Sequence, residues 1–177
     1  RLEISPGKCT AEEWLEVMRV AHQEGLLTTA TMMIGGGETV RNRVEHLENL
    51  RELQDETGGF VAFIPWNVQL EDTPMKALIE NEVGSLEYLT LLAVSRLYLD
   101  NFKNIQVSWL TQSLKVAQIA LRWGANDVGS IMIEENVMSV AGACYTANQQ
   151  DLVRVISTAG FVPVQRDTLY QTFQNTS

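Results

Sequence analysis

Short β-compatible apolar runs alternate along this chain with longer amphipathic stretches, and glycine residues separate the two kinds of segment. Residues 26–34 and 60–65 are typical of strands, and the second run is nearly all apolar, as in a strand covered on both faces. Gly25, Gly58 and Gly124 follow stretches of helical periodicity and are natural helix ends. This alternation constrains the fold to the α/β class, with parallel strands and right-handed crossovers.

The pattern predicts four strands and five helices. The strands are expected over residues 26–34, 60–65, 105–110 and 127–133, and the helices over residues 10–24, 38–57, 85–100, 116–123 and 149–159. Thr10 and Glu13 have the spacing of a capping box at the start of the first helix. These elements suit either a small doubly wound domain or half of a (β/α)8 barrel, which normally takes about 250 residues.

The composition is that of a globular protein, since 45% of the 177 residues are hydrophobic and 20% are charged. The net charge of −9 argues against nucleic acid and anionic membrane surfaces as partners, because both attract basic surfaces. No apolar run approaches the roughly 20 residues of a membrane span. Cys9 and Cys144 are too few for a disulfide framework or a zinc site. We therefore expect a cytoplasmic protein with no metal ligands of its own.

Polar residues collect where the predicted strands end, and they also alternate with apolar residues inside the strands. Ligands of parallel α/β folds bind beyond the carboxyl ends of the strands, so the Gly35–Gly37 turn would lie on a ligand-binding rim. Thr29 and Thr31 alternate with apolar neighbours, which indicates a wet or ligand-filled interior. The alternative is a packed core in which such groups hydrogen-bond one another. Glu134 and Glu135 could supply a general base or form a solvated loop pair.

Two stretches carry a family resemblance: residues 53–66, which read LQDETGGFVAFIPW, and residues 124–130, which read GANDVGS. They resemble the radical S-adenosylmethionine enzymes of the futalosine route to menaquinone, the family of cyclic dehypoxanthine futalosine synthase. Residues 132–137 favour the cyclising type over its siblings, aminofutalosine synthase and deazaflavin (F0) synthase, which stay as alternatives. A half-barrel that binds a partner without catalysis is the alternative outside enzymology.

The resemblance implies a (β/α) TIM-type barrel with a [4Fe-4S] cluster on a C-x3-C-x2-C loop after its first strand. The sequence has no such triplet. The chain would therefore be the C-terminal half of the enzyme, with the fifth to eighth strands in residues 1–147 and a helix and tail that pack on the barrel in residues 148–177. Its partner would be the missing N-terminal half, which holds the cluster, and the chain alone would be inactive.

The implied chemistry begins with S-adenosylmethionine, which the reduced cluster cleaves to a 5′-deoxyadenosyl radical. The radical would take a ribose hydrogen from the small-molecule substrate, dehypoxanthine futalosine, and the resulting carbon radical would close the new ring. Residues 31–38 are similar to the G-x-I-x-G-x-x-E stretch of such enzymes, so Met33, Gly35 and Glu38 are expected beside the cofactor. Ordinary strand-end packing is the alternative for each of them.

The same resemblance implies further site residues. Ile64 and Pro65 would continue the apolar wall beside the cofactor. Glu134 or Asp127 would act as a proton acceptor. The polar residues expected to contact the substrate lie within or just after the later strands: Asn67, Gln69 and Ser108.

Overall fold

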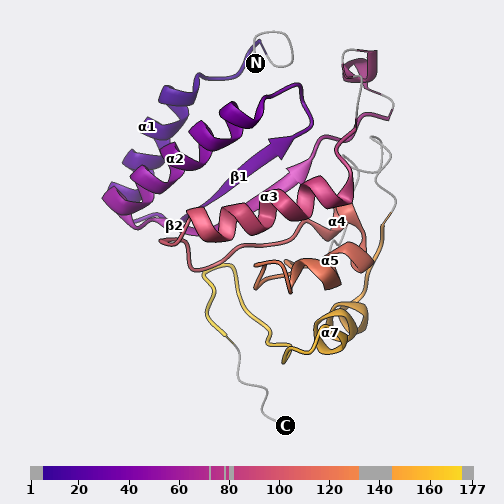
Figure 1. Ribbon diagram of the computed structural model, residues 1–177. Coiled ribbons are helices and arrows are strands. Elements are labelled where there is room, and N and C mark those ends of the chain that lie inside the picture. The colour runs from indigo at the N-terminus through magenta and orange to yellow at the C-terminus, as the bar shows by residue number, and fades with distance from the viewer. Residues whose placement is uncertain (1–5, 72, 78, 80–81, 132–144, 173–177) are drawn as a thin grey trace.

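The computed structural model describes residues 6–71, 73–77, 79, 82–131 and 145–172 of the chain. Its elements follow one another in the order α1 (Ala11–Gln23), β1 (Thr28–Ile34), α2 (Val40–Thr57), β2 (Phe60–Asn67), the short 3-10 helix η1 (Pro74–Ala77), α3 (Ser85–Tyr98), α4 (Trp109–Gln112), α5 (Leu114–Ala120) and α7 (Gln149–Thr158). Helices and strands alternate through the first half of the chain, as the sequence predicts (Figure 1).

The strands form a parallel arrangement, so the predicted α/β class is confirmed. β1 and β2 are hydrogen-bonded parallel neighbours along all of β1. Two isolated parallel bridges continue the sheet, Phe63 with Ile105 and Gln106 with Asp127. The four segments therefore lie side by side in the order in which they occur in the sequence.

The strands predicted over residues 105–110 and 127–133 are wrong in extent, because each contributes only bridge residues in the described part of the chain. The first segment turns into α4 at Trp109. In the second, Asp127 Oδ1 accepts a hydrogen bond from the N–H of Gly129, whose φ is +73°. A left-handed residue at this position ends the extended conformation. Residues 132 and 133 lie outside the described residues.

Local hydrogen bonds explain where the helices begin and end. Thr10 Oγ1 accepts from the N–H of Glu13, and the Glu13 carboxylate accepts from the N–H of Thr10, so the predicted capping box is confirmed. α2 ends at Gly58, which is left-handed with a φ of +63°. α3 begins at Ser85, where the sequence predicts it, and its N-cap is Gly84.

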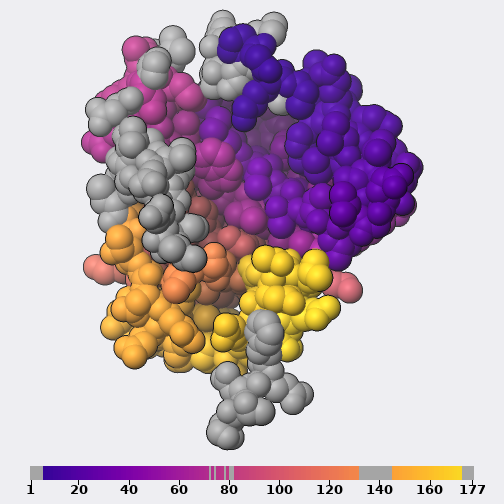
Figure 2. Space-filling model, turned by 180° about the vertical axis from the view of Figure 1, so that it is seen from behind, coloured from indigo at the N-terminus to yellow at the C-terminus, as the bar shows by residue number. Residues whose placement is uncertain are grey.

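The helices cover one face of the strands. Ala30, Met32 and Ile34 of β1 are buried in the core that α2 and α3 complete, whereas Thr29 and Thr31 are exposed on the other side. Figure 1 shows α2 and α3 on the near side of the strands. Figure 2 shows the opposite side, which we call the open face, with the last described residues in yellow at its lower end. The open face thus carries the exposed threonines of β1, together with half-buried apolar side chains such as Met33 and Ile64.

Aromatic packing joins α1 to the core. Phe60 stacks on Trp14 and on Phe102, with ring centroids 6.2 and 5.5 Å apart. His22 meets the edge of Phe60 and hydrogen-bonds to the hydroxyls of Thr28 and Thr57, so it is a packing residue. Within the described ranges, no helix is both long and apolar enough to cross a membrane.

Candidate functional site

Strand alternation decides which predicted site residues reach the open face. Met33 lies opposite Trp66 in the register, and Thr31 lies opposite Ile64. Met33 and Ile64 are therefore on the same face as the exposed threonines, and both are half-buried. Pro65 lies opposite Met32 on the helix-covered face, where its side chain is buried. The expectation that Ile64 and Pro65 form one wall is wrong for this reason, and only Ile64 faces the open side.

The turn after β1, which we call the glycine loop (Gly35–Gly37), is shaped by a carboxylate. Glu38 Oε1 accepts from the N–H of Gly35 at 2.9 Å, and Oε2 accepts from the N–H of Gly36 at 2.8 Å. Burial by itself would raise the pKa of Glu38, but these N–H groups and the Arg43 guanidinium together lower it. The carboxylate therefore stays ionised, and its hydrogen bonds to Gly35 and Gly36 fix the conformation of the glycine loop.

Arg43 continues this arrangement toward α3. Its Nη2 lies 2.7 Å from Glu38 Oε1, and its Nη1 lies 2.7 Å from Glu87 Oε1 in the first turn of α3. The Arg43 side chain is only 13% exposed. Sequence reasoning missed this residue, because the arginines of α2 resemble a solvated helix face and Glu87 lies 44 positions away.

Asn67 and Gln69 lie next to the glycine loop. Asn67 Nδ2 donates to the carbonyl of Val83 at 2.8 Å, and the Asn67 Oδ1 is buried and accepts no hydrogen bond in the structure. A Cβ on Gly35 would lie 2.9 Å from Val83 Cγ2, so the segment that Asn67 holds is packed directly on the loop. Gln69 Nε2 donates to the Asn67 carbonyl at 3.1 Å. Both residues therefore lie beside the glycine loop, and their side-chain N–H groups donate to backbone carbonyls of the same chain.

Ser108 is joined to β2 through a residue that the sequence gives no reason to single out. The Tyr88 hydroxyl donates to the carbonyl of Pro65 at 3.2 Å and accepts from the N–H of Ser108 at 3.0 Å. Burial raises the pKa of Tyr88, so the phenol stays neutral. The Ser108 hydroxyl accepts from Thr111 at 3.1 Å. Tyr88 thus fixes the carboxyl ends of two neighbouring segments.

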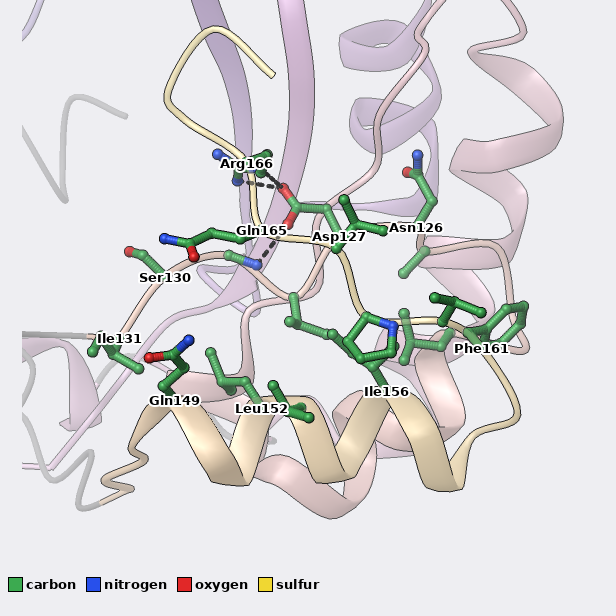
Figure 3. Close-up of a pocket in the computed structure, with 18 residues that line it drawn as sticks. Asn126, Asp127, Ser130, Ile131, Gln149, Leu152, Ile156, Phe161, Gln165 and Arg166 are labelled. Carbon is green, nitrogen blue, oxygen red and sulfur yellow. Dashed lines mark hydrogen bonds and ion pairs between the residues drawn. The ribbon is translucent and has the colours of Figure 1, made fainter. Parts of the chain in front are cut away.

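Asp127 binds the C-terminal segment, by which we mean residues 161–172. Its Oδ2 lies 2.5 Å from Arg166 Nη2 and 2.5 Å from the Tyr170 hydroxyl. Its Oδ1 accepts from the N–H of Gly129 at 2.9 Å. Arg166 also donates to Gln106 Oε1 at 3.3 Å. Figure 3 shows the contact between Asp127 and Arg166. With its side chain 9% exposed, Asp127 is occupied by partners from its own chain, which weakens its expected role as a proton acceptor.

A cavity of about 640 Å³ lies between residues 125–131, α7 and the C-terminal segment. Figure 3 shows Leu152 and Ile156 of α7 pointing into it from below, with Asp127 and Arg166 on the opposite side. The described lining is mostly apolar and includes no residue of the glycine loop. This cavity is therefore separate from the rim that the sequence predicts.

The described residues contain no group of three or more His, Cys, Asp or Glu side chains placed to hold a metal ion. Cys9 is exposed. Glu134, the other expected proton acceptor, and Cys144 lie outside the described residues. His46 Nε2 donates to the carbonyl of Thr31, and burial lowers the pKa of the ring. Both histidines in the sequence thus have partners within the fold.

Comparison with known proteins places the sequence among defined relatives. A profile of the family described as "CofH/MqnC C-terminal region" matches residues 57–177. Cyclic dehypoxanthine futalosine synthase of Streptomyces coelicolor is 46% identical over 97% of this chain and 42% of its own length. Aminodeoxyfutalosine synthase of Thermus thermophilus is 42% identical, over 97% of this chain and 47% of its own length.

A third relative carries the name of a different enzyme. The 5-amino-6-(D-ribitylamino)uracil–L-tyrosine 4-hydroxyphenyl transferase of Methanosphaerula palustris is 43% identical, over 94% of this chain and 47% of its own length. The chain spans slightly less than half the length of these curated relatives. This chain is therefore similar, over nearly its whole length, to proteins that carry three different names.

Proposed function

This chain belongs to the CofH/MqnC C-terminal family, and on that premise we propose that it is the C-terminal part of a radical S-adenosylmethionine enzyme. The proposed reaction is the cyclisation of dehypoxanthine futalosine on the route to menaquinone. The observation that carries the proposal is the 46% identity to cyclic dehypoxanthine futalosine synthase over 97% of this chain. The relative named aminodeoxyfutalosine synthase, at 42% identity, makes that activity the second candidate.

The proposal includes the half-barrel fold. Residues 1–147 would supply four of eight parallel segments, and residues 148–177 a C-terminal helix and tail. The side-by-side order of β1, β2 and the bridges at Ile105 and Asp127 supports this assignment. Strand edges at the two ends of this row would pair with the N-terminal half of the enzyme, which closes the barrel and removes the unpaired edges.

The open face suits the nucleoside of S-adenosylmethionine. Met33 and Ile64 present half-buried apolar surface there, and Gly35, directly after β1, lets the glycine loop pack closely against Val83 beside them. Glu38 would act through the loop that it holds, and the Pro65 side chain faces away. When bound, S-adenosylmethionine supplies the radical chemistry, while the described residues of this chain offer no ligand set for the [4Fe-4S] cluster that would reduce it.

The protein's part is then to hold and orient the substrate. Gln69 and Ser108 lie at the rim with side chains that are not fully buried, and they are proposed to contact polar groups of dehypoxanthine futalosine. Asn67 would position the Val83 segment and offer its unused Oδ1. Glu134 remains the proposed proton acceptor, since Asp127 is bound to Arg166. These roles are orientation and proton transfer.

The direct test uses the full-length protein that contains this chain, reconstituted and reduced under anaerobic conditions. With dehypoxanthine futalosine we expect release of 5′-deoxyadenosine and one equivalent of the cyclic product, identified by mass. Conversion of only the aminodeoxyfutalosine synthase substrate would establish the second candidate instead. If a preparation that contains its cluster released no 5′-deoxyadenosine with any of these substrates, both candidate activities would be contradicted. A non-catalytic binding role for this half of the barrel would then be the remaining hypothesis.

A further inference from the structure

Two ion pairs connect the glycine loop to the start of α3, and their shared residue is Arg43. We propose that Arg43 is a positioning residue, which holds the loop in the conformation that binds S-adenosylmethionine. The inference rests on the proposed function for the identity of the ligand. The geometry of the loop itself does not depend on that identity.

The loop conformation needs such support. Gly35 and Gly37 have φ values of +85° and +92°, and the N–H groups of Gly35 and Gly36 both point at one carboxylate. Glu38 is close to these donors in sequence, but its side chain is 20% exposed and free to rotate into solvent if nothing else binds it. Arg43 binds it with Nε at 2.9 Å and Nη2 at 2.7 Å, both on Oε1. Charge-assisted bonds of this kind are the stronger hydrogen bonds of proteins.

The second pair brings α3 into the same arrangement. Glu87 follows the Val83 segment by four residues, and Val83 is the side chain that a Cβ on Gly35 would meet at 2.9 Å. The N-cap of α3, Gly84, has no side chain that could fix this helix start. The Arg43–Glu87 pair, at 2.7 Å, therefore holds the start of α3 against the loop. Arg43 thus orients both the loop and the segment packed on it.

The same helix carries a matched control. Arg41 Nε lies 2.7 Å from Glu45 Oε1, so this pair has the same separation as the Arg43 pairs. The Arg41 side chain is 86% exposed, against 13% for Arg43. Arg41→Gln therefore removes an equivalent charge and an ion pair from α2 at the surface. Exposed pairs of this kind contribute little to stability.

The experiment compares Arg43→Gln, Arg43→Lys and Arg41→Gln in the full-length protein. The first readout is amide hydrogen exchange of the peptide that spans residues 33–39, which needs neither cluster nor substrate. In Arg43→Gln we expect exchange at Gly35 and Gly36 to accelerate roughly tenfold, with intermediate rates in Arg43→Lys and wild-type rates in Arg41→Gln. Glu38→Gln serves as the reference in which the loop contact itself is changed.

The second readout is the affinity for S-adenosylmethionine. We expect its KM to rise roughly tenfold in Arg43→Gln, with kcat changed less than KM and with partial recovery in Arg43→Lys. A purely structural role for Arg43 would instead lower the active fraction, and so kcat, at constant KM.

Equal exchange rates and equal KM in Arg43→Gln and Arg41→Gln would overturn the inference. A wild-type protein that does not bind S-adenosylmethionine would overturn the proposed function, while the exchange rates would still decide whether Arg43 holds the loop. The two failures are therefore distinguishable.

Discussion

Asp127 and Arg166 are 39 positions apart in the sequence and form an ion pair in which Oδ2 and Nη2 are separated by 2.5 Å. The pair connects the last bridge of the sheet to the C-terminal segment. Tyr170 donates to the same carboxylate oxygen, and its ring lies 3.9 Å from the Arg166 guanidinium carbon. The three side chains form one unit, so a change in any of them affects the attachment of the whole segment.

Asp127→Asn is expected to destabilise the protein by about 2–3 kcal/mol, because the substitution leaves the half-buried Arg166 without its anionic partner. Urea-induced unfolding measures the change. The control is Glu45→Gln, which removes the exposed partner of Arg41 and is expected to cost less than about 0.5 kcal/mol. Equal costs in the two variants would mean that Asp127 does not anchor the C-terminal segment.

Tyr170 is expected to ionise later than an ordinary tyrosine. Burial, together with the hydrogen bond to Asp127 and its negative charge, raises the pKa of Tyr170. Because the unfolded state releases this proton first, Tyr170 stabilises the fold below the ordinary tyrosine pKa of 10.0, and this contribution is lost as the pH rises further. Spectroscopic titration of Tyr170→Phe should lack one late-ionising group relative to wild type. Loss of a group that titrates near the ordinary pKa would contradict the assignment.

His22 is expected to make stability fall in mild acid. Burial lowers the pKa of His22, and its two ring nitrogens bond to the Thr28 and Thr57 hydroxyls. The Thr57 hydroxyl donates to the Leu53 carbonyl, so it accepts from Nδ1 of His22. In the neutral ring, which burial favours, Nε2 accepts from the Thr28 hydroxyl.

The unfolded state therefore binds the proton first, and the stability from the neutral ring is complete above pH 6.5 and lost as the pH falls. Urea unfolding midpoints measured from about pH 8 to about pH 5, the range in which histidine titrates, give this dependence of stability on pH. His22→Gln should flatten the slope, although burial also lowers the pKa of His46, which keeps part of it. An unchanged slope in His22→Gln would contradict the neutral-ring assignment.

Gly59→Ala is expected to destabilise the fold by about 1–3 kcal/mol through overpacking. A Cβ at this position would lie 2.1 Å from Cγ of the His22 ring, which is held on both sides by hydrogen bonds. Thermal or urea unfolding measures the loss. Gly7→Ala is the control, because a Cβ there meets nothing within 4 Å. Equal stability of the two alanine variants would contradict the expected clash between the new Cβ and the His22 ring.

The glycine loop and the open face were partly predictable because their signals are local. Met33 and Ile64 lie on one face of the strands and Pro65 lies on the other. Because side chains alternate along a strand, the neighbours Ile64 and Pro65 could have been assigned to opposite faces from the sequence. Gly35 was identified as a strand-end residue, but its close contact with Val83 depends on a segment almost fifty residues further along.

The sequence by itself determined the start of α1, the end of α2, the α/β class and the family. The Thr10 and Glu13 capping box and the end of α2 at Gly58 depend on hydrogen bonds that span only a few residues, so composition and spacing carry them. The extent of the later strands was wrong because a strand exists only where a neighbour pairs with it, and apolar alternation over residues 105–110 does not specify that neighbour.

Only the tertiary structure decided which charged residues act together. Arg43 reaches Glu87 across 44 positions and Asp127 reaches Arg166 across 39, and each arginine looks in the sequence like a surface residue among others. Whether a carboxylate is a base, a loop holder or an anchor depends on the donors that surround it. Those donors come from elements that only the packing of the whole chain brings together.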